Sequence, residues 1–271
     1  MHKVSFIGGG NMAAAIVGGL VASGTPPADI EVVEVNADAR AQLAARFGVV
    51  TQPDISQARL SGLVVLAVKP QTLPQVCAVL GPRLSGQVVV SIAAGVRVAD
   101  LSRWLGGHAR IVRAMPNTPA LVQAGITGLF ASAAVGAAER SQAESVLRAV
   151  GGVVWVDDET QLDAVTAVSG SGPAYVFYCI ESLEAAAVAQ GLPAATARQL
   201  ALHTFFGAAK LALESGEEPG VLRARVTSKG GTTERGLAAL EAAAVGHAFA
   251  QAVKAASDRS AELGDELGRL A

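Results

Sequence analysis

A glycine-rich segment near the N-terminus has the residue types and spacing of a loop that binds a dinucleotide. Residues 8–13 read GGGNMA and satisfy the pattern G-x-G-x-x-A, between an apolar run at 4–7 and an apolar stretch of helical spacing at 12–22. Glycines permit a tight turn and close approach to a pyrophosphate, and the N-terminus of the next helix offers N–H groups. The dinucleotide contacts that we expect here are Gly8, Gly10, Asn11 and Met12.

An acidic residue near the end of the second apolar run bears on which dinucleotide is bound. Glu34 lies about 20 residues beyond Ala13, where an acid can hold the ribose 2′-OH of NAD. Arg40 follows only a turn or two into the next predicted helix, although Asn36 and the N-terminus of that helix could hold a 2′-phosphate. Taken alone, these residues lean slightly toward NADH, and Glu34 and Asn36 are candidate cofactor contacts. The alternative for Glu34 is an exposed charge at a helix entry.

Three further predicted strand ends carry small or polar residues, and ligands of such folds bind at the carboxyl ends of strands. These loops read AVKPQ at 67–71, SIAAG at 91–95 and MPNTP at 115–119. Small residues let a nicotinamide ring approach the backbone, while prolines stiffen the third loop. An ordinary rigid turn is the alternative for each loop taken singly. The cofactor contacts expected from these loops are Ala67, Val68, Lys69, Pro70, Ala93 and Asn117.

The densest cluster of hydroxyl groups and glycines lies between two predicted helices, where residues 226–235 read VTSKGGTTER. The N–H groups of a Gly-Gly turn, hydroxyls and a helix N-terminus together make a nest for a carboxylate. A helix cap needs one hydroxyl, whereas this loop offers four together with two glycines. We therefore favour ligand binding over simple capping. The candidate substrate contacts are Ser228, Gly230, Gly231, Thr232 and Thr233.

The sequence has no histidine placed to act as the acid of an alcohol dehydrogenase, and no cluster of His, Cys and carboxylates suggests a metal. Lys69 could be a general acid, but its place beside Pro70 suits contact with the dinucleotide at least as well. The hydride acceptor should therefore need little help from a protein acid. A C=N bond meets that condition, because its nitrogen protonates far more readily than a ketone oxygen.

These loops need a sheet and helices to position them, and the apolar pattern predicts both. Apolar runs alternate with helical stretches over the first two-thirds of the chain, which is typical of a mostly parallel sheet covered on both faces. Predicted strands are 4–7, 30–35, 63–68, 88–92, 111–114, 128–131 and 153–156, and predicted helices between them are 12–22, 37–47 and 137–150. After about residue 158 only helices are expected, at 162–168, 174–190, 194–215, 219–226, 233–244 and 247–268.

The predicted fold is α/β, with an N-terminal Rossmann-type doubly wound sheet over residues 1–160 and a C-terminal all-helical domain over residues 161–271. Of the 271 residues, 51% are hydrophobic and 16% charged, which excludes a disordered chain. A net charge of −2 argues against nucleic acid, no apolar run is long enough for a membrane span, and no signal segment precedes the first strand. We expect a cytoplasmic protein, with an Ala-, Leu- and Val-rich helical domain buried in an obligate dimer at least.

The order of motifs along the chain resembles that of pyrroline-5-carboxylate reductases. The resemblance covers essentially the whole chain, and its last motif is close to the family's signature. The motifs are IGGGNMA (7–13), AVKPQ (67–71), SIAAG (91–95), MPNTP (115–119), AVTAVSGSGPAY (164–175) and VTSKGGTTERGL (226–237). It implies a Rossmann domain and a helical dimerisation domain, whose helices interlock with a partner's in a homodimer. Dimers of the family often assemble further into decamers.

The resemblance also implies the last step of proline biosynthesis, in which a hydride passes from NAD(P)H to the C=N bond of 1-pyrroline-5-carboxylate and gives L-proline. It places the substrate carboxylate on Ser228, Gly230, Gly231 and Thr233, with Thr233 near the ring nitrogen as its candidate donor. The family mostly favours NADPH, so we expect NADPH with NADH tolerated. Two departures bear on this expectation, because Lys229 stands where many members have Pro and Glu34 is acidic where an NADPH-selective site would prefer neutral or basic groups.

Two other functions stay open on the sequence. A dehydrogenase of the β-hydroxy-acid type would need a catalytic lysine on a helix of the second domain, where Lys210 is the main candidate. A sensor that binds NADP(H) without turnover would have no need of the carboxylate loop.

Overall fold

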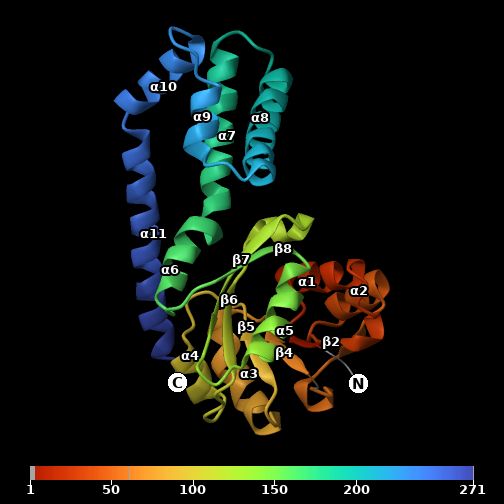
Figure 1. Ribbon diagram of the computed structural model, residues 1–271. Coiled ribbons are helices and arrows are strands. Elements are labelled where there is room, and N and C mark those ends of the chain that lie inside the picture. Colours follow the sequence, from red (N-terminus) through yellow and green to blue (C-terminus); the bar gives the residue numbers. More distant parts are fainter. Residues whose placement is uncertain (1–3, 61, 271) are drawn as a thin grey trace. The chain divides into compact units, whose positions relative to one another are not determined.

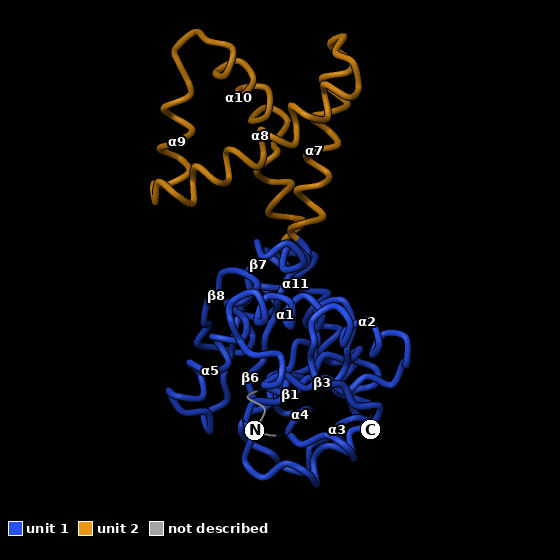
Figure 2. The backbone as a smooth tube through the Cα atoms, turned by 90° about the vertical axis from the view of Figure 1, so that its right-hand side faces the viewer, with its two compact units in different colours: residues 1–171, 254–271 blue, residues 172–253 orange. Residues whose placement is uncertain are grey.

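The computed structural model describes residues 4–60 and 62–270, and it forms two compact units (Figure 2). The first unit runs up to Ser171 and takes up the chain again from Lys254, while the second unit comprises Gly172–Val253. The end of the chain therefore belongs with its beginning. The domain boundary predicted at 160/161 stays a prediction, since these units are defined by contacts within a single chain.

Over the described residues the first unit is built on one eight-stranded sheet, with the order β3-β2-β1-β4-β5-β6-β7-β8. Neighbouring strands are parallel except for the pair β6 and β7. The strand order reverses between β1 and β4, so the doubly wound sheet predicted from the sequence is confirmed. The strands are β1 (Val4–Ile7), β2 (Ile30–Val33), β3 (Val50–Gln52), β4 (Leu63–Leu66), β5 (Val88–Ser91), β6 (Ile111–Met115), β7 (Gly125–Ala131) and β8 (Gly151–Trp155).

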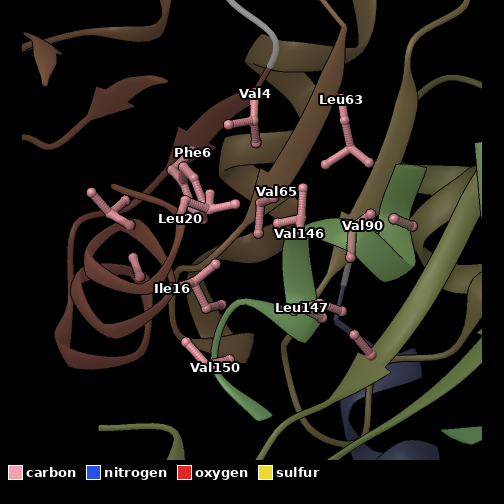
Figure 3. Close-up of a cluster of buried hydrophobic side chains, with 14 of the residues drawn as sticks. Val4, Phe6, Ile16, Leu20, Leu63, Val65, Val90, Val146, Leu147 and Val150 are labelled. Carbon is pink, nitrogen blue, oxygen red and sulfur yellow. The ribbon is translucent and has the colours of Figure 1, made fainter. Parts of the chain in front are cut away.

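Helices cover both faces of this sheet. The strands contribute alternate residues to a buried apolar cluster on each face. On one side Val4 and Phe6 of β1 pack with Ile16 and Leu20 of α1 and with residues of α5 (Figure 3). On the other side the buried apolar cluster draws on α3, α4 and the end of α11. The helices of the first unit are α1 (Asn11–Ala22), α2 (Ala37–Phe47), α3 (Leu73–Leu80), α4 (Val98–Trp104), α5 (Ala137–Arg148), α6 (Gln161–Val165) and the end of α11 (Val245–Gly268) (Figure 1).

The second unit is helical throughout its described residues and has almost no core of its own. Among residues 172–253 only Ala197 and Ala201 are buried, whereas Phe177, Phe206 and Leu213 are 61, 66 and 85% exposed. Helices gain most of their stability in proteins by packing an apolar face, so this unit needs a further surface to cover it. Its helices are α7 (Gly172–Ala189), α8 (Ala194–Ser215), α9 (Pro219–Arg225), α10 (Thr232–Ala242) and the beginning of α11.

Several predicted boundaries were wrong. The second strand ends at Val33 rather than 35, which leaves Glu34 outside the sheet, and the strand at 63–68 ends at Leu66. The helix predicted over 162–168 is α-helical only to Val165 and continues as a π-helical turn over Thr166–Gly170. The sequence analysis also missed β3, α3 and α4, which are short.

No single helix among the described residues has the length and apolar character for a membrane span. The pair α10 and α11, bent by 50°, meets that criterion only when the two are taken together.

Candidate functional site

In the glycine loop that follows β1, one glycine has a positive φ, one is crowded by side chains and one has open space beside it. Gly8 has φ +102°, and a Cβ there would lie 2.7 Å from the carbonyl oxygen of Ala67, at the end of β4. At Gly9 a Cβ would lie 2.7 Å from Cδ1 of Leu43, while at Gly10 it would meet nothing within 4 Å. The chain therefore passes close between β1 and β4 and leaves open space at Gly10.

That open space lies at the N-terminus of α1, for which Gly10 is the cap residue. No side chain caps this helix, and its first turn carries no acidic residue. The first N–H groups of any α-helix have no partner within the helix, and the helix dipole makes this end partly positive. The residues present therefore fit the pyrophosphate of a dinucleotide, and the contacts predicted for Gly8, Gly10, Asn11 and Met12 stay a prediction.

Glu34 accepts two backbone hydrogen bonds, one of them from the glycine loop. Gly9 N donates to Oε2 of Glu34 at 2.8 Å, and Asn36 N donates to Oε1 at 2.8 Å. The half-buried carboxylate is thus a brace between β2 and the loop, in addition to being a candidate acceptor for a ribose hydroxyl. The alternative of a merely exposed charge at a helix entry is wrong, because both carboxylate oxygens have partners within the chain.

The neighbouring polar side chains are also engaged. Oδ1 of Asn36 accepts from Ala39 N at 2.9 Å and caps α2. Nη1 of Arg40 donates to the backbone carbonyl oxygens of Glu34 and Val35, at 2.7 and 2.8 Å. The Arg40 guanidinium therefore holds the loop after β2.

Two of the remaining predicted strand ends border the glycine loop or the core. Cγ1 of Val68 lies 2.9 Å from the position of a Cβ on Gly8, which places the loop after β4 against the glycine loop. Lys69 is exposed at the start of a 3₁₀ turn, Pro70–Thr72. Ala93 is buried in the core cluster that also contains the end of α11. Their contact with a cofactor stays a prediction.

Asn117 braces two distant segments of the first unit. Its side chain is nearly buried; Oδ1 accepts from Ile126 N at 2.9 Å, and Nδ2 donates to the carbonyl oxygen of Ser169 at 3.1 Å. A Cβ on Gly170 would lie 2.6 Å from Cε of Met115, so the π-helical turn lies directly against the MPN segment. The amide predicted to serve a cofactor therefore has a structural role, and its role as a cofactor contact is untested.

The hydroxyl-rich loop of the second unit forms a closed turn that leads into α10. Gly231 N donates to the carbonyl oxygen of Ser228 at 3.0 Å, and Gly230 has φ +74° inside the turn. A Cβ on Gly231 would lie 2.5 Å from Oγ of Ser228, so the serine hydroxyl lies over that glycine. Gly231 is the cap residue of α10, and Thr232 and Thr233 are its first two residues.

This geometry separates the two interpretations of the loop. A glycine at the cap position has no hydroxyl, and no side-chain cap hydrogen bond is present at the start of α10. The residues Ser228, Thr232 and Thr233 are exposed beside N–H groups that the helix itself leaves unpaired. The interpretation as a simple cap is therefore wrong, and the arrangement offers hydroxyl and N–H donors for a carboxylate.

The sequence analysis missed one residue of this loop. Oε2 of Glu234 accepts from Gly230 N at 2.6 Å. A glutamate in the third position of a helix commonly reaches back to the N–H groups before the helix, and that spacing was the available signal.

Lys210, the candidate catalytic lysine of the alternative dehydrogenase, is a surface residue of α8. Its ammonium group lies 3.7 Å from the carboxylate of Glu214 one turn along the helix, and its side chain is 57% exposed. Such pairs are common on helix surfaces and have little energetic effect. Within the described residues no group of three or more His, Cys, Asp and Glu side chains could hold a metal.

Comparison with known proteins gives consistent matches over nearly the full length. The family model for pyrroline-5-carboxylate reductase dimerisation matches residues 159–263, and the model for NADP oxidoreductase coenzyme F420-dependent matches residues 3–95. The pyrroline-5-carboxylate reductase of Pseudomonas aeruginosa is 47% identical over 269 residues, 98% of each chain. That of Escherichia coli is 39% identical over 264 residues, 96% of this chain and 98% of its own.

Two solved structures agree with these relatives. A pyrroline-5-carboxylate reductase from Coxiella burnetii has a TM-score of 0.94 and 45% identity, and covers 97% of this chain and 98% of its own. The pyrroline carboxylate reductase of Plasmodium falciparum, solved with NADP bound, has a TM-score of 0.84 and 28% identity, with the same coverage.

Proposed function

This chain belongs to the pyrroline-5-carboxylate reductase family, as its motifs predicted, and from that premise we propose that it reduces 1-pyrroline-5-carboxylate to L-proline. The enzyme is an NADP(H)-dependent oxidoreductase that acts on a C=N bond, in the last step of proline biosynthesis. The observation that carries this function is the 47% identity to a reductase of that name over 98% of both chains.

NADPH, when bound, supplies the hydride for the imine carbon. In our proposal the loop from Gly8 to Met12 holds the pyrophosphate at the N-terminus of α1, where Gly10 leaves space for it. Arg40 and the N-terminus of α2 face the 2′-phosphate, and Glu34 keeps the loop in place through Gly9. The loops at 67–70, Ala93 and Asn117 then border the nicotinamide.

The turn at 228–233 binds the substrate carboxylate in this proposal. Oγ of Ser228, the hydroxyls of Thr232 and Thr233 and the first N–H groups of α10 supply neutral donors, and the helix dipole adds partial positive charge. The Thr233 hydroxyl lies at the ring nitrogen, where it donates to the lone pair of the neutral imine and accepts from the N–H of the protonated one. An imine that is protonated at nitrogen is already activated, so the residues act mainly by orienting the substrate and by complementing its charge.

Residues 159–263 match the dimerisation region of the family, so the protein is an oligomer. We propose a homodimer in which the exposed apolar side chains of α7 and α8 are covered by a second copy, with decamers as a further level of assembly. We further propose that it acts in the cytoplasm on small molecules and binds neither nucleic acid nor membranes.

A single assay tests the proposed function. Purified protein is mixed with 1-pyrroline-5-carboxylate, and oxidation of NADPH or NADH is followed while proline is identified as the product. We expect turnover with NADPH, and slower turnover with NADH. Turnover of a β-hydroxy acid in place of the imine would support the alternative dehydrogenase, and cofactor binding without any turnover would support the sensor.

A further inference from the structure

The carboxylate-binding turn of the second unit contains a carboxylate of its own. Oε2 of Glu234 lies 2.6 Å from Gly230 N, although all of the surrounding residues from Ser228 to Arg235 except Gly231 are exposed to solvent. A negative side chain at this site repels a negative substrate, so the charge of Glu234 does not help to attract the substrate. The position therefore calls for a different role.

The hydrogen bonds of the turn show which role this is. Gly231 N is paired with the carbonyl oxygen of Ser228, and Gly230 N is paired with Glu234. The N–H groups of Gly230 and Gly231 are thus both paired within the chain, so the turn is closed before any ligand arrives. The donors that remain for a substrate include the first N–H groups of α10 and the hydroxyls of Ser228, Thr232 and Thr233.

The turn also needs a hydrogen bond to a residue outside it, because its own residues do not restrict the backbone angles. Lys229 occupies the position at which a proline would preset φ, and Gly230, at φ +74°, adopts left- and right-handed conformations with similar ease. The hydrogen bond from Gly230 N to Glu234 of α10 restricts the backbone at Lys229 and Gly230. Ordering the turn in advance removes an entropic penalty from substrate binding.

We propose that Glu234 is a positioning residue that holds the carboxylate-binding turn in its binding conformation. It acts through Gly230 and does not contact the substrate. This inference rests on the proposed function, because it assigns the turn to the substrate carboxylate. Its alternative is that Glu234 occupies the carboxylate site as a placeholder, which the substrate must displace.

Three variants of Glu234 separate the two roles. Glu234→Gln keeps an oxygen that can accept from Gly230 N, Glu234→Asp keeps the charge on a side chain that is shorter by one methylene group, and Glu234→Ala removes both. Glu241→Ala is the matched control, since it removes an exposed carboxylate further along the same helix. For each full-length protein we would measure KM and kcat for 1-pyrroline-5-carboxylate, product inhibition by proline and hydrogen exchange of segment 228–233.

We expect Glu234→Ala and Glu234→Asp to raise KM for the imine and the inhibition constant of proline by about tenfold, a change within the range for one lost hydrogen bond, with kcat within about twofold of the wild type. Exchange at 228–233 should speed up in both variants, while Glu234→Gln and Glu241→Ala should resemble the wild type. If Glu234→Ala does not fold, Glu234→Asp carries the same test.

A lower KM in Glu234→Ala would identify a placeholder and overturn the inference, as would equal losses in Glu234→Gln and Glu234→Ala. Unchanged exchange at 228–233 in Glu234→Asp and Glu234→Ala would also overturn it, and this readout needs no turnover. Failure of the proposed function would show differently, as absence of imine reduction by the wild type itself.

Discussion

Thr233 is the residue on which the proposed substrate site is most sharply tested. It is the second residue of α10, after the cap residue Gly231, and no side-chain cap hydrogen bond is present there. Replacing it by Ala therefore removes no cap, and Ala has the higher helix propensity. We expect the melting temperature of Thr233→Ala to be unchanged or slightly higher.

Catalysis should respond very differently. If the Thr233 hydroxyl donates to the substrate, its loss removes a hydrogen bond to a charged ligand, which is typically equivalent to about 1.5–3 kcal/mol. The corresponding fall in kcat/KM for the imine is roughly 10- to 150-fold. The dissociation constant of NADPH should change little, because the glycine loop belongs to the other compact unit.

The matched control is Thr227→Ala. Oγ1 of Thr227 already donates to the carbonyl oxygen of Arg223 at 2.6 Å, so that hydroxyl is occupied within the chain next to the same loop. Kinetics, NADPH titration and thermal unfolding of both variants give the comparison. A Thr233→Ala enzyme with kcat/KM near that of the wild type would refute the assignment of this loop to the substrate.

Three more outcomes are expected. Glu34→Ser should shift the ratio of kcat/KM values toward NADPH, since it removes a negative charge near the proposed 2′-phosphate, and an unchanged ratio would mean that Glu34 acts only through Gly9. Gly10→Ala should fold normally, because its Cβ meets nothing in the chain, but it should bind NADPH at least about tenfold more weakly. Gly8→Ala should instead lower the melting temperature, because Gly8 has a positive φ and its Cβ would lie 2.7 Å from the carbonyl oxygen of Ala67. Normal NADPH binding by Gly10→Ala would contradict the assignment of this loop to the pyrophosphate. Light scattering at micromolar concentration should show a dimer or larger, with a melting temperature that rises with protein concentration, and a monodisperse monomer would contradict the assembly.

The sequence predicted those parts of the fold whose secondary structure is determined by residues adjacent in the chain. Three of the four residues from 4 to 7 are apolar, and three glycines follow at once. The structure places β1 and the glycine loop there. The helix predicted from Ala37 to about Phe47 is α2, whose start is capped by Asn36 and whose end is at Gly48 in a left-handed conformation.

The parts that the sequence did not predict depend on partners far along the chain. Strand β3 has only three residues, all partly exposed, so no apolar run marks it, and its pairing with β2 supplies its stability. The π-helical turn ends with Ser169 and Gly170 against Met115 and Asn117, and Asn117 and Ser169 are 52 positions apart. No local pattern reveals such a contact, and for the same reason the contacts of the Asn117 amide with Ile126 and Ser169 could not be predicted.

The two candidate binding loops are stabilised in the same way, although they lie in different units and are assigned different ligands in our proposal. Each needs glycine, since Gly8 and Gly230 have positive φ, and each lies at the N-terminus of a helix whose first N–H groups suit an anion. Glycine also leaves a loop free to move, which weakens binding. In both loops a glutamate carboxylate accepts a glycine N–H, from Gly9 in the case of Glu34 and from Gly230 in the case of Glu234. A negative side chain close to an anion site is unfavourable for affinity, so its presence in both places indicates that a fixed loop matters more to these sites than the charge they would otherwise avoid.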